Sequence, residues 1–226
     1  MSTSPQSRAF EVWHVQLARA IFAGIAAVMI TFSPDHSADV GLAVFSGFAL
    51  ATGIVMLVSA WLVYPVRRRW PAVLLGLVSV LAGMAGGLPP LRSTILFFVL
   101  VIAWAFTAGL VETISGWRAL RAAKRGEAAL GPASEARDAV VVGVLTLALA
   151  VALPLVPVGF SLEYTVAEAG QTFTLTGIIL AVGIFGGYAA IVAVYLAIAG
   201  FSPRKPQPQP QPAPAESPAT HDGGSA

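Results

Sequence analysis

The stretch Gly53-Ile-Val-Met-Leu-Val-Ser-Ala-Trp61 recurs as Gly109-Leu-Val-Glu-Thr-Ile-Ser-Gly-Trp117, and more loosely as Gly187-Tyr-Ala-Ala-Ile-Val-Ala-Val-Tyr195. The first two copies share Gly, Val, Ser and Trp in register, and each copy lies toward the end of a long apolar run. Self-similarity of this kind indicates that one structural unit was copied along the chain. The sequence therefore predicts three related helical hairpins.

The composition argues against a soluble globular fold. Hydrophobic residues make up 57% of the 226 residues and charged residues only 11%, whereas soluble domains carry about 25% charged residues. The long apolar runs must therefore face lipid, so the first predicted partner is the bilayer. A net charge of +2 gives no indication of nucleic acid binding. The absence of cysteine excludes disulfides, thiolate metal sites and cysteine nucleophiles.

Six apolar segments are long enough to span a bilayer, which takes about 20 helical residues. They are Trp13–Phe32, Val40–Tyr64, Pro71–Leu88, Thr94–Trp117, Ala139–Val158 and Thr174–Phe201. The first is expected to be retained rather than cleaved as a signal peptide, because Arg19 lies inside its apolar region. We predict an all-α integral membrane protein whose six transmembrane helices form the hairpins 13–64, 70–117 and 139–201.

The remaining segments are more polar. Residues 1–12 form a short N-terminus, and 118–138 is predicted to be a charged linker that is helical at its start, over 119–125. The outer segment 159–173 is long enough to form a small cap over the bundle. The Pro-rich tail 202–226 is too polar to fold, so we expect it to be disordered.

The distribution of basic residues predicts the orientation. With the N-terminus inside, only Arg92 falls in an outer loop, whereas eleven basic residues fall on the cytoplasmic side. Those eleven are Arg8, Arg67, Arg68, Arg69, Arg118, Arg121, Lys124, Arg125, Arg137, Arg204 and Lys205. Six spans then place both termini in the cytoplasm of a bacterial cell, with the chain in its cytoplasmic (inner) membrane.

Two charged residues fall at membrane depth. Glu112 lies about 7.5 Å inside the boundary residue Trp117, and Arg19 lies about 9 Å inside Trp13, on the same side. A charge at such a depth costs on the order of 2–3 kcal/mol unless it is paired, hydrated or neutralised. Three interpretations stay open: an ion pair between the two, snorkelling of each to the headgroups, and a protonatable gate.

Small residues repeat on two of the helices. Gly76, Gly83 and Gly87 lie on the third helix, and Gly183 and Gly187 lie on the sixth. Such positions let helix backbones approach closely in a membrane. Packing within the chain is the favoured interpretation, and a seam in a homo-oligomer is the alternative.

No catalytic, cofactor or metal site is predicted. His14, His36 and His221 have no second ligand at helical spacing. No phosphate loop, HExxH pair or GxSxG elbow occurs either. We therefore expect a protein without enzymatic activity and without a cofactor.

The chain resembles the HdeD family of small bacterial membrane proteins, which are built from short repeated hairpins. The residues that carry the resemblance are Arg19-Ala-Ile, Gly24, Pro34, Trp70, Leu75-Gly76, Pro89, Trp104, Gly109, Glu112, Arg137-Asp138, Gly143 and Pro154. The resemblance spans about Arg19 to Gly200 and implies a stress-associated, acid-resistance type of membrane component. It implies no catalytic residues. The charged linker and the Pro-rich tail depart from the family pattern.

Two functions follow from these observations. The first is a non-enzymatic, stress-associated or accessory membrane component of the HdeD-like type, which would act with a membrane-protein partner or as a homo-oligomer. The alternative is a small transporter or channel for protons or a small solute. In that alternative, Glu112 would be the titratable group inside the membrane.

Overall fold

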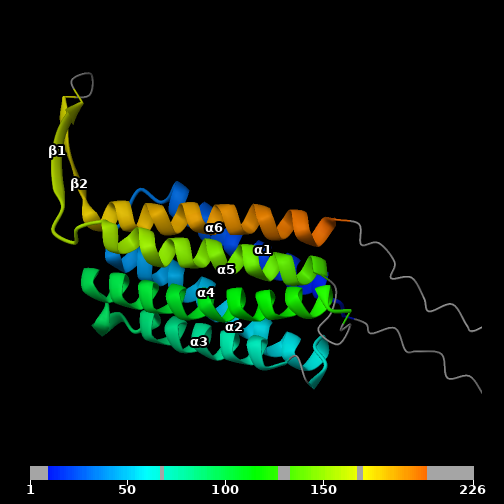
Figure 1. The fold of residues 1–226 in the computed structure, drawn as a ribbon. Coiled ribbons are helices and arrows are strands. Elements are labelled where there is room, and N and C mark those ends of the chain that lie inside the picture. Colours follow the sequence, from blue (N-terminus) through cyan, green and yellow to red (C-terminus); the bar gives the residue numbers. More distant parts are fainter. Residues whose placement is uncertain (1–9, 67–68, 127–132, 167–169, 203–226) are drawn as a thin grey trace, which may run out of the picture.

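A computed structural model describes residues 10–66, 69–126, 133–166 and 170–202 of the chain. Six helices run back and forth along one axis, as Figure 1 shows. All six are long and apolar enough to cross a membrane. The predicted all-α fold with six spans is confirmed. Residues 1–9 of the predicted N-terminus and residues 203–226 of the predicted tail lie outside the described residues.

The helices alternate in direction along the chain. They are α1 (Val12–Phe32), α2 (Ala38–Leu62), α3 (Arg69–Gly87), α4 (Thr94–Lys124), α5 (Ala133–Ala152) and α6 (Gly177–Phe201). Two short 3-10 helices, η2 (Pro89–Leu91) and η4 (Leu153–Leu155), follow α3 and α5. An antiparallel pair of strands, β1 (Ser161–Val166) and β2 (Gln171–Thr176), lies between η4 and α6.

One end of the bundle collects the basic side chains. The beginning of α1 and the end of α6 lie at this end, together with the connections from α2 to α3 and from α4 to α5 (Figure 1). Of the eleven predicted cytoplasmic residues, the structure describes Arg69, Arg118, Arg121, Lys124, Arg125 and Arg137, and all of them lie here. Arg8, Arg67, Arg68, Arg204 and Lys205 lie outside the described residues. We call this the basic end, and the opposite end the hairpin end.

The predicted linker 118–138 is shorter than expected, because helices extend into it from both sides. The predicted helical start is confirmed, since α4 continues to Lys124. At the other side, α5 already begins at Ala133. It also ends at Ala152, before the expected Val158, because Pro154 has no N–H to donate to the preceding turn.

The beginning of the sixth span was also predicted wrongly. Residues Thr174–Thr176 belong to strand β2, and α6 begins only at Gly177. The sequence Gln171-Thr-Phe-Thr-Leu-Thr176 alternates apolar and β-branched polar residues, which favours a strand over a helix. The segment 159–173 does not form the expected cap over the bundle. It belongs to a hairpin that projects sideways beyond the outline of the helices (Figure 1).

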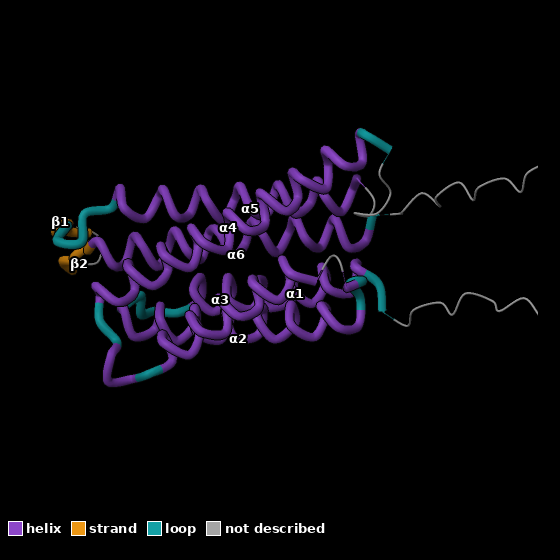
Figure 2. The backbone as a smooth tube through the Cα atoms, turned by 60° about the horizontal axis from the view of Figure 1, so that its bottom comes forward, coloured by secondary structure: helices purple, strands orange, loops and turns teal. Residues whose placement is uncertain are grey.

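The helices form a closed arrangement in which each contacts its neighbours in sequence and α6 returns to pack on α1. Figure 2 shows the same bundle turned about its length. The predicted hairpins appear as adjacent antiparallel helices. The closest packing, however, lies in the pairs α2/α3, α4/α5 and α6/α1.

Glycines explain why these pairs pack so closely. A Cβ atom built on Gly53 would lie 2.9 Å from the carbonyl oxygen of Gly76, and one built on Gly109 would lie 2.9 Å from that of Gly143. Without a Cβ atom, the two backbones of each pair can touch and gain van der Waals contact. Gly53 and Gly109 are the first residues of the two matching copies of the repeat, so the repeat marks equivalent helix contacts.

The glycines predicted on the third helix do pack within the chain. A Cβ atom on Gly83 would lie 2.8 Å from the backbone nitrogen of Leu50, and one on Gly76 would lie 2.6 Å from Leu57 Cγ. Gly87 faces the Ser46 hydroxyl, and that hydroxyl donates a 2.6 Å hydrogen bond to the Gly83 carbonyl. The packing interpretation is therefore confirmed for this helix.

The same interpretation is wrong for Gly183 and Gly187. Both are exposed on the outer surface of α6, and a Cβ atom on either would meet nothing within 4 Å. Instead, Gly186 faces Ile30 and Gly200 faces Leu17, so α6 turns a different set of glycines toward α1. The difference arises because the third copy of the repeat does not share the register of the other two. The oligomer seam stays a prediction for this pair.

Candidate functional site at the centre of the bundle

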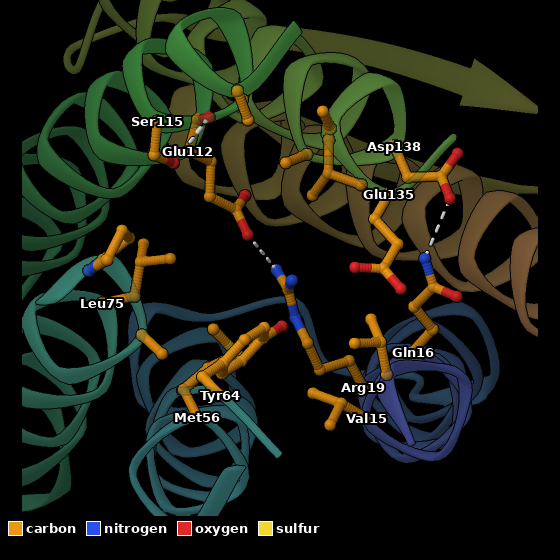
Figure 3. A pocket seen from close by; sticks show the side chains of 18 of the residues that line it. Val15, Gln16, Arg19, Met56, Tyr64, Leu75, Glu112, Ser115, Glu135 and Asp138 are labelled. Carbon is orange, nitrogen blue, oxygen red and sulfur yellow. Dashed lines mark hydrogen bonds and ion pairs between the residues drawn. The ribbon is translucent and has the colours of Figure 1, made fainter. Parts of the chain in front are cut away.

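The structure brings the two predicted intramembrane charges together. Arg19 comes from α1 and Glu112 from α4, and the Arg19 Nη2 atom lies 2.7 Å from Glu112 Oε1. The two side chains are 17% and 5% exposed. Around the closed ring of six helices, α1 and α4 lie on opposite sides. The ion pair between Arg19 and Glu112 therefore crosses the interior of the bundle, as Figure 3 shows.

The ion-pair interpretation of Arg19 and Glu112 is thus confirmed, and independent snorkelling is wrong. Both side chains point into the interior of the bundle rather than toward the headgroups (Figure 3). In this position each charge offsets the other's cost of leaving water. The protonatable gate stays a prediction.

A cavity of about 330 Å³ lies on the basic side of this pair. We call it the vestibule. Residues from all six helices line it, and most of its wall is apolar. The lining residues that carry polar or charged side chains include Gln16, Arg19, Tyr64, Glu112, Ser115, Arg118, Glu135 and Asp138. A volume in this range, with few polar groups on an apolar wall, is typical of small-molecule sites.

A second, much smaller cavity of about 20 Å³ lies on the far side of the ion pair. We call it the inner chamber. Five residues line both cavities and therefore form the partition between them: Arg19, Met56, Leu75, Glu112 and Leu196. They come from α1, α2, α3, α4 and α6, one from each helix. We call this partition the constriction.

The inner chamber is lined by hydroxyl groups at membrane depth. Tyr188 and Thr146 share a hydrogen bond of 2.9 Å between their hydroxyl oxygens. The Trp104 indole N–H donates a 3.1 Å bond to the Ser79 hydroxyl. The Thr52 hydroxyl oxygen is buried and has no hydrogen-bond partner among the described residues. A buried polar atom without a partner is costly, so Thr52 marks a place where a water molecule or a polar solute group would bind favourably.

Aromatic side chains fill the axis next to the inner chamber, toward the hairpin end. Phe45 packs edge-on against Trp104 and Phe185, with ring centroids 5.4 and 5.6 Å apart. Phe48 makes similar edge contacts with the same two residues, at 5.6 and 5.8 Å. Phe45 and Phe185 are completely buried. This cluster separates the inner chamber from the hairpin end.

Sequence reasoning missed the carboxylates of the vestibule wall. Asp138 accepts a 2.9 Å hydrogen bond from Gln16 Nε2 and a 3.0 Å bond from the Tyr195 hydroxyl, which ties α5 to α1 and α6. Glu135 lines the same wall. Both had been assigned to the linker 118–138. The helical spacing of these residues could have indicated that they share one face of α5. Residues on this face recur every three or four positions, and all of them line a cavity: Glu135, Asp138, Val142 and Thr146.

The repeat also places equivalent aromatic residues at the basic end. The guanidinium carbon of Arg69 lies 5.1 Å from the centre of the Trp61 ring, and that of Arg121 lies 3.8 Å from the Trp117 ring. Both tryptophans are largely exposed. Arginine stacked on an exposed tryptophan is suited to the interface between lipid and water.

Within the described parts of the chain, no group of three His, Cys, Asp or Glu side chains is placed to hold a metal ion. The fold and this interior site define the class as a multi-pass helical membrane protein with two internal cavities divided by a buried ion pair. No protein-family model, curated protein or solved structure matches the chain.

Proposed function

We propose that this multi-pass membrane protein is a small transporter or channel for protons or a small solute, and that Arg19 and Glu112 form its gate. The observation that supports the proposal is the pair of cavities on either side of the constriction. One ion pair spans the constriction between opposite helices. Separation of that single pair would join the vestibule to the inner chamber.

A buried ion pair is suited to gating because it is stable only while both partners are charged. Protonation of Glu112 removes its attraction to Arg19, and a charged solute in the vestibule competes for either partner. The other ionisable groups on the walls of the two cavities are Tyr64 just after α2, Arg118 on α4, Glu135 and Asp138 on α5, and Tyr188 on α6.

Proton flux into proteoliposomes tests this function directly. A pH-sensitive dye trapped inside the vesicles reports the flux, and potassium with valinomycin sets the membrane potential. We expect flux above that of protein-free vesicles, with a dependence on pH that is lost in Glu112→Gln. Glu163→Gln makes the same chemical change at an exposed site on β1 and serves as the control. Equal flux from the wild type and Glu112→Gln would contradict a role for the ion pair.

A solute other than the proton needs a separate measurement. Tracer uptake by the same vesicles, screened over small anions, cations and neutral solutes, would identify it. Uptake that requires an intact Arg19 and Glu112 supports the gate. If neither protons nor any tracer moved faster than through protein-free vesicles, the transport proposal would be wrong.

A stress-associated or accessory role of the HdeD-like type is the second candidate, and it is favoured by the resemblance described above. In this role the protein would have no enzymatic activity and would act through a membrane-protein partner or a second copy of itself. Affinity purification in mild detergent followed by mass spectrometry tests it. A partner recovered in fixed proportion supports the role, and recovery of the chain alone as a monomer argues against it.

The proposed location is the bacterial cytoplasmic membrane, with the basic end in the cytoplasm. The asymmetry of Arg and Lys between the two ends supports this orientation. Reporter fusions at His36 and Gly126 test it, because these residues lie at opposite ends of the bundle. Activity of a periplasm-dependent reporter at Gly126 would reverse the orientation.

A further inference from the structure

The hairpin between η4 and α6 has two chemically different faces. In its register Leu162 pairs with Leu175 and Tyr164 pairs with Phe173. Paired residues lie on the same face of a sheet and neighbours along a strand lie on opposite faces. These four apolar residues therefore share one face, which we call the apolar face. The opposite face carries Ser161, Glu163, Thr165, Thr172, Thr174 and Thr176.

Side-chain contacts agree with this division. The Tyr164 and Phe173 rings stack with centroids 5.7 Å apart and an angle of 25° between their planes. On the polar face, the hydroxyl oxygens of Thr165 and Thr172 lie 3.2 Å apart. Cross-strand pairs therefore stabilise both faces of the hairpin. The four apolar residues pair with one another on one face, and polar residues pair with polar residues on the other.

Nothing in the described chain covers the apolar face. Leu162, Tyr164 and Phe173 are 51%, 47% and 42% exposed. A two-stranded hairpin that packs on nothing is marginally stable in water. Stable pairing of β1 with β2 therefore calls for an apolar environment that takes up these side chains.

The position of the hairpin indicates which environment that is. It runs across the helix axes at the end of the bundle and extends past the outline of the helices (Figure 1). Its base is tied to α6, because the Gly177 N–H donates a 2.9 Å hydrogen bond to the Phe160 carbonyl. Since α6 crosses the membrane, a ribbon perpendicular to it lies in the membrane plane, at the level where the helices leave the lipid.

We propose that the hairpin rests in the outer surface of the bilayer, with its apolar face in the boundary between headgroups and acyl chains. Among the described residues of the ribbon, the carboxylate of Glu163 lies on the polar face, where it remains in water. Tyrosine is enriched at this depth of a membrane, and an amphipathic element lying flat there buries its apolar side. The hairpin thereby fixes the depth and tilt of α6, independently of any transport through the bundle.

Spin labelling tests this proposal, because the chain contains no cysteine and single cysteines can be placed freely. Leu162→Cys and Phe173→Cys report on the apolar face. Thr172→Cys and Thr174→Cys report on the polar face and leave the four apolar side chains intact. In proteoliposomes, collisions with oxygen report contact with lipid, and collisions with a water-soluble nickel chelate report contact with water.

We expect the ratio of oxygen to nickel accessibility to invert between the two faces, high at Leu162 and Phe173 and low at Thr172 and Thr174. High nickel accessibility on both faces would place the ribbon in water and overturn the proposal. Dipolar broadening of the Leu162 or Phe173 spectra would also overturn it, since it would show a second copy of the chain on the apolar face. Leu162→Cys and Phe173→Cys are independent reporters of the same face, so either one keeps the test valid if the other fails to fold.

Discussion

Met56 and Glu112 occupy the same position in two copies of the nine-residue repeat, and both side chains line the constriction between the vestibule and the inner chamber. The equivalent residue of the third copy, Ala190, is exposed on the outer surface of α6. In the two copies that share a register, one position thus gives an apolar wall and a buried carboxylate.

Removing one partner of the ion pair is expected to destabilise the protein more than removing both. Arg19→Gln and Glu112→Gln should each cost about 3 kcal/mol, since each leaves an unpaired charge in the interior. The double variant should recover part of that loss. Thermal unfolding of the four proteins in one detergent measures the coupling. Strictly additive losses would contradict an energetic coupling between Arg19 and Glu112.

The repeat predicts where a carboxylate can be moved. Met56→Glu combined with Glu112→Met keeps one carboxylate on the constriction, so Arg19 retains a partner there. This double variant should be more stable than Glu112→Met alone. Ala190→Glu with Glu112→Met is the matched control, because it places the charge in lipid at a cost on the order of 2–3 kcal/mol. Equal thermal stability of the two double variants would show that the repeat positions are not equivalent in the way proposed.

Glycine substitutions should separate packed from lipid-facing positions. Gly109→Ala inserts a methyl group against the backbone of α5 and should cost about 1–3 kcal/mol. Gly183→Ala meets nothing and should be neutral or stabilising by up to about 1 kcal/mol, because alanine favours the helix. Thermal unfolding measures both. A large loss from Gly183→Ala would indicate that this face is covered by another copy.

Gly187→Leu tests that oligomer seam directly. In a monomer the leucine would face lipid and leave the molecular mass in detergent unchanged. Light scattering coupled to size exclusion measures the mass of wild type and variant. A fall in mass caused by Gly187→Leu would establish a seam between chains at α6.

Accessibility of single cysteines should follow the two cavities. Ser115→Cys lies on the vestibule wall and should react with a charged, water-soluble thiol reagent. Thr52→Cys lines the inner chamber without losing a hydrogen bond and should be protected. Adding Arg19→Gln should expose it, because the ion pair closes the constriction. Rapid reaction of Thr52→Cys beside an intact Arg19 would mean that the constriction is open in the resting protein. Mass spectrometry of the labelled proteins gives the extent of reaction.

Whether a site residue could be predicted from the sequence depended on its position in its helix. Arg19 and Glu112 could be found because each falls well inside an apolar segment, where a charge needs an explanation. Asp138 was missed because it lies close to a helix start, and a charge there is ordinary. Thr146 and Tyr188 carried no signal of their own, since hydroxyls in membrane helices commonly bond within or between helices.

The hairpin shows a second limit of pattern reading. The sequence prediction assigned Thr174–Thr176 to the sixth span, because the apolar segment was extended outward until polar residues interrupted it. The alternation of residues 171–176 was the better guide. Strand β1 pairs with β2 in antiparallel fashion, as the alternation alone would have indicated for a strand.

Hydropathy in the sequence determined that the chain forms six membrane-spanning helices, and the distribution of charge determined that its basic residues collect at one end. Both features follow from the preference of single residues for lipid or water. Tertiary structure alone decided that Arg19 meets Glu112, that α6 closes on α1 with Gly186 and not Gly187, and that two cavities lie on the axis. Those features depend on the direction in which each helix face turns. In a membrane, where lipid and core are equally apolar, close packing decides that direction, and hydrophobicity does not.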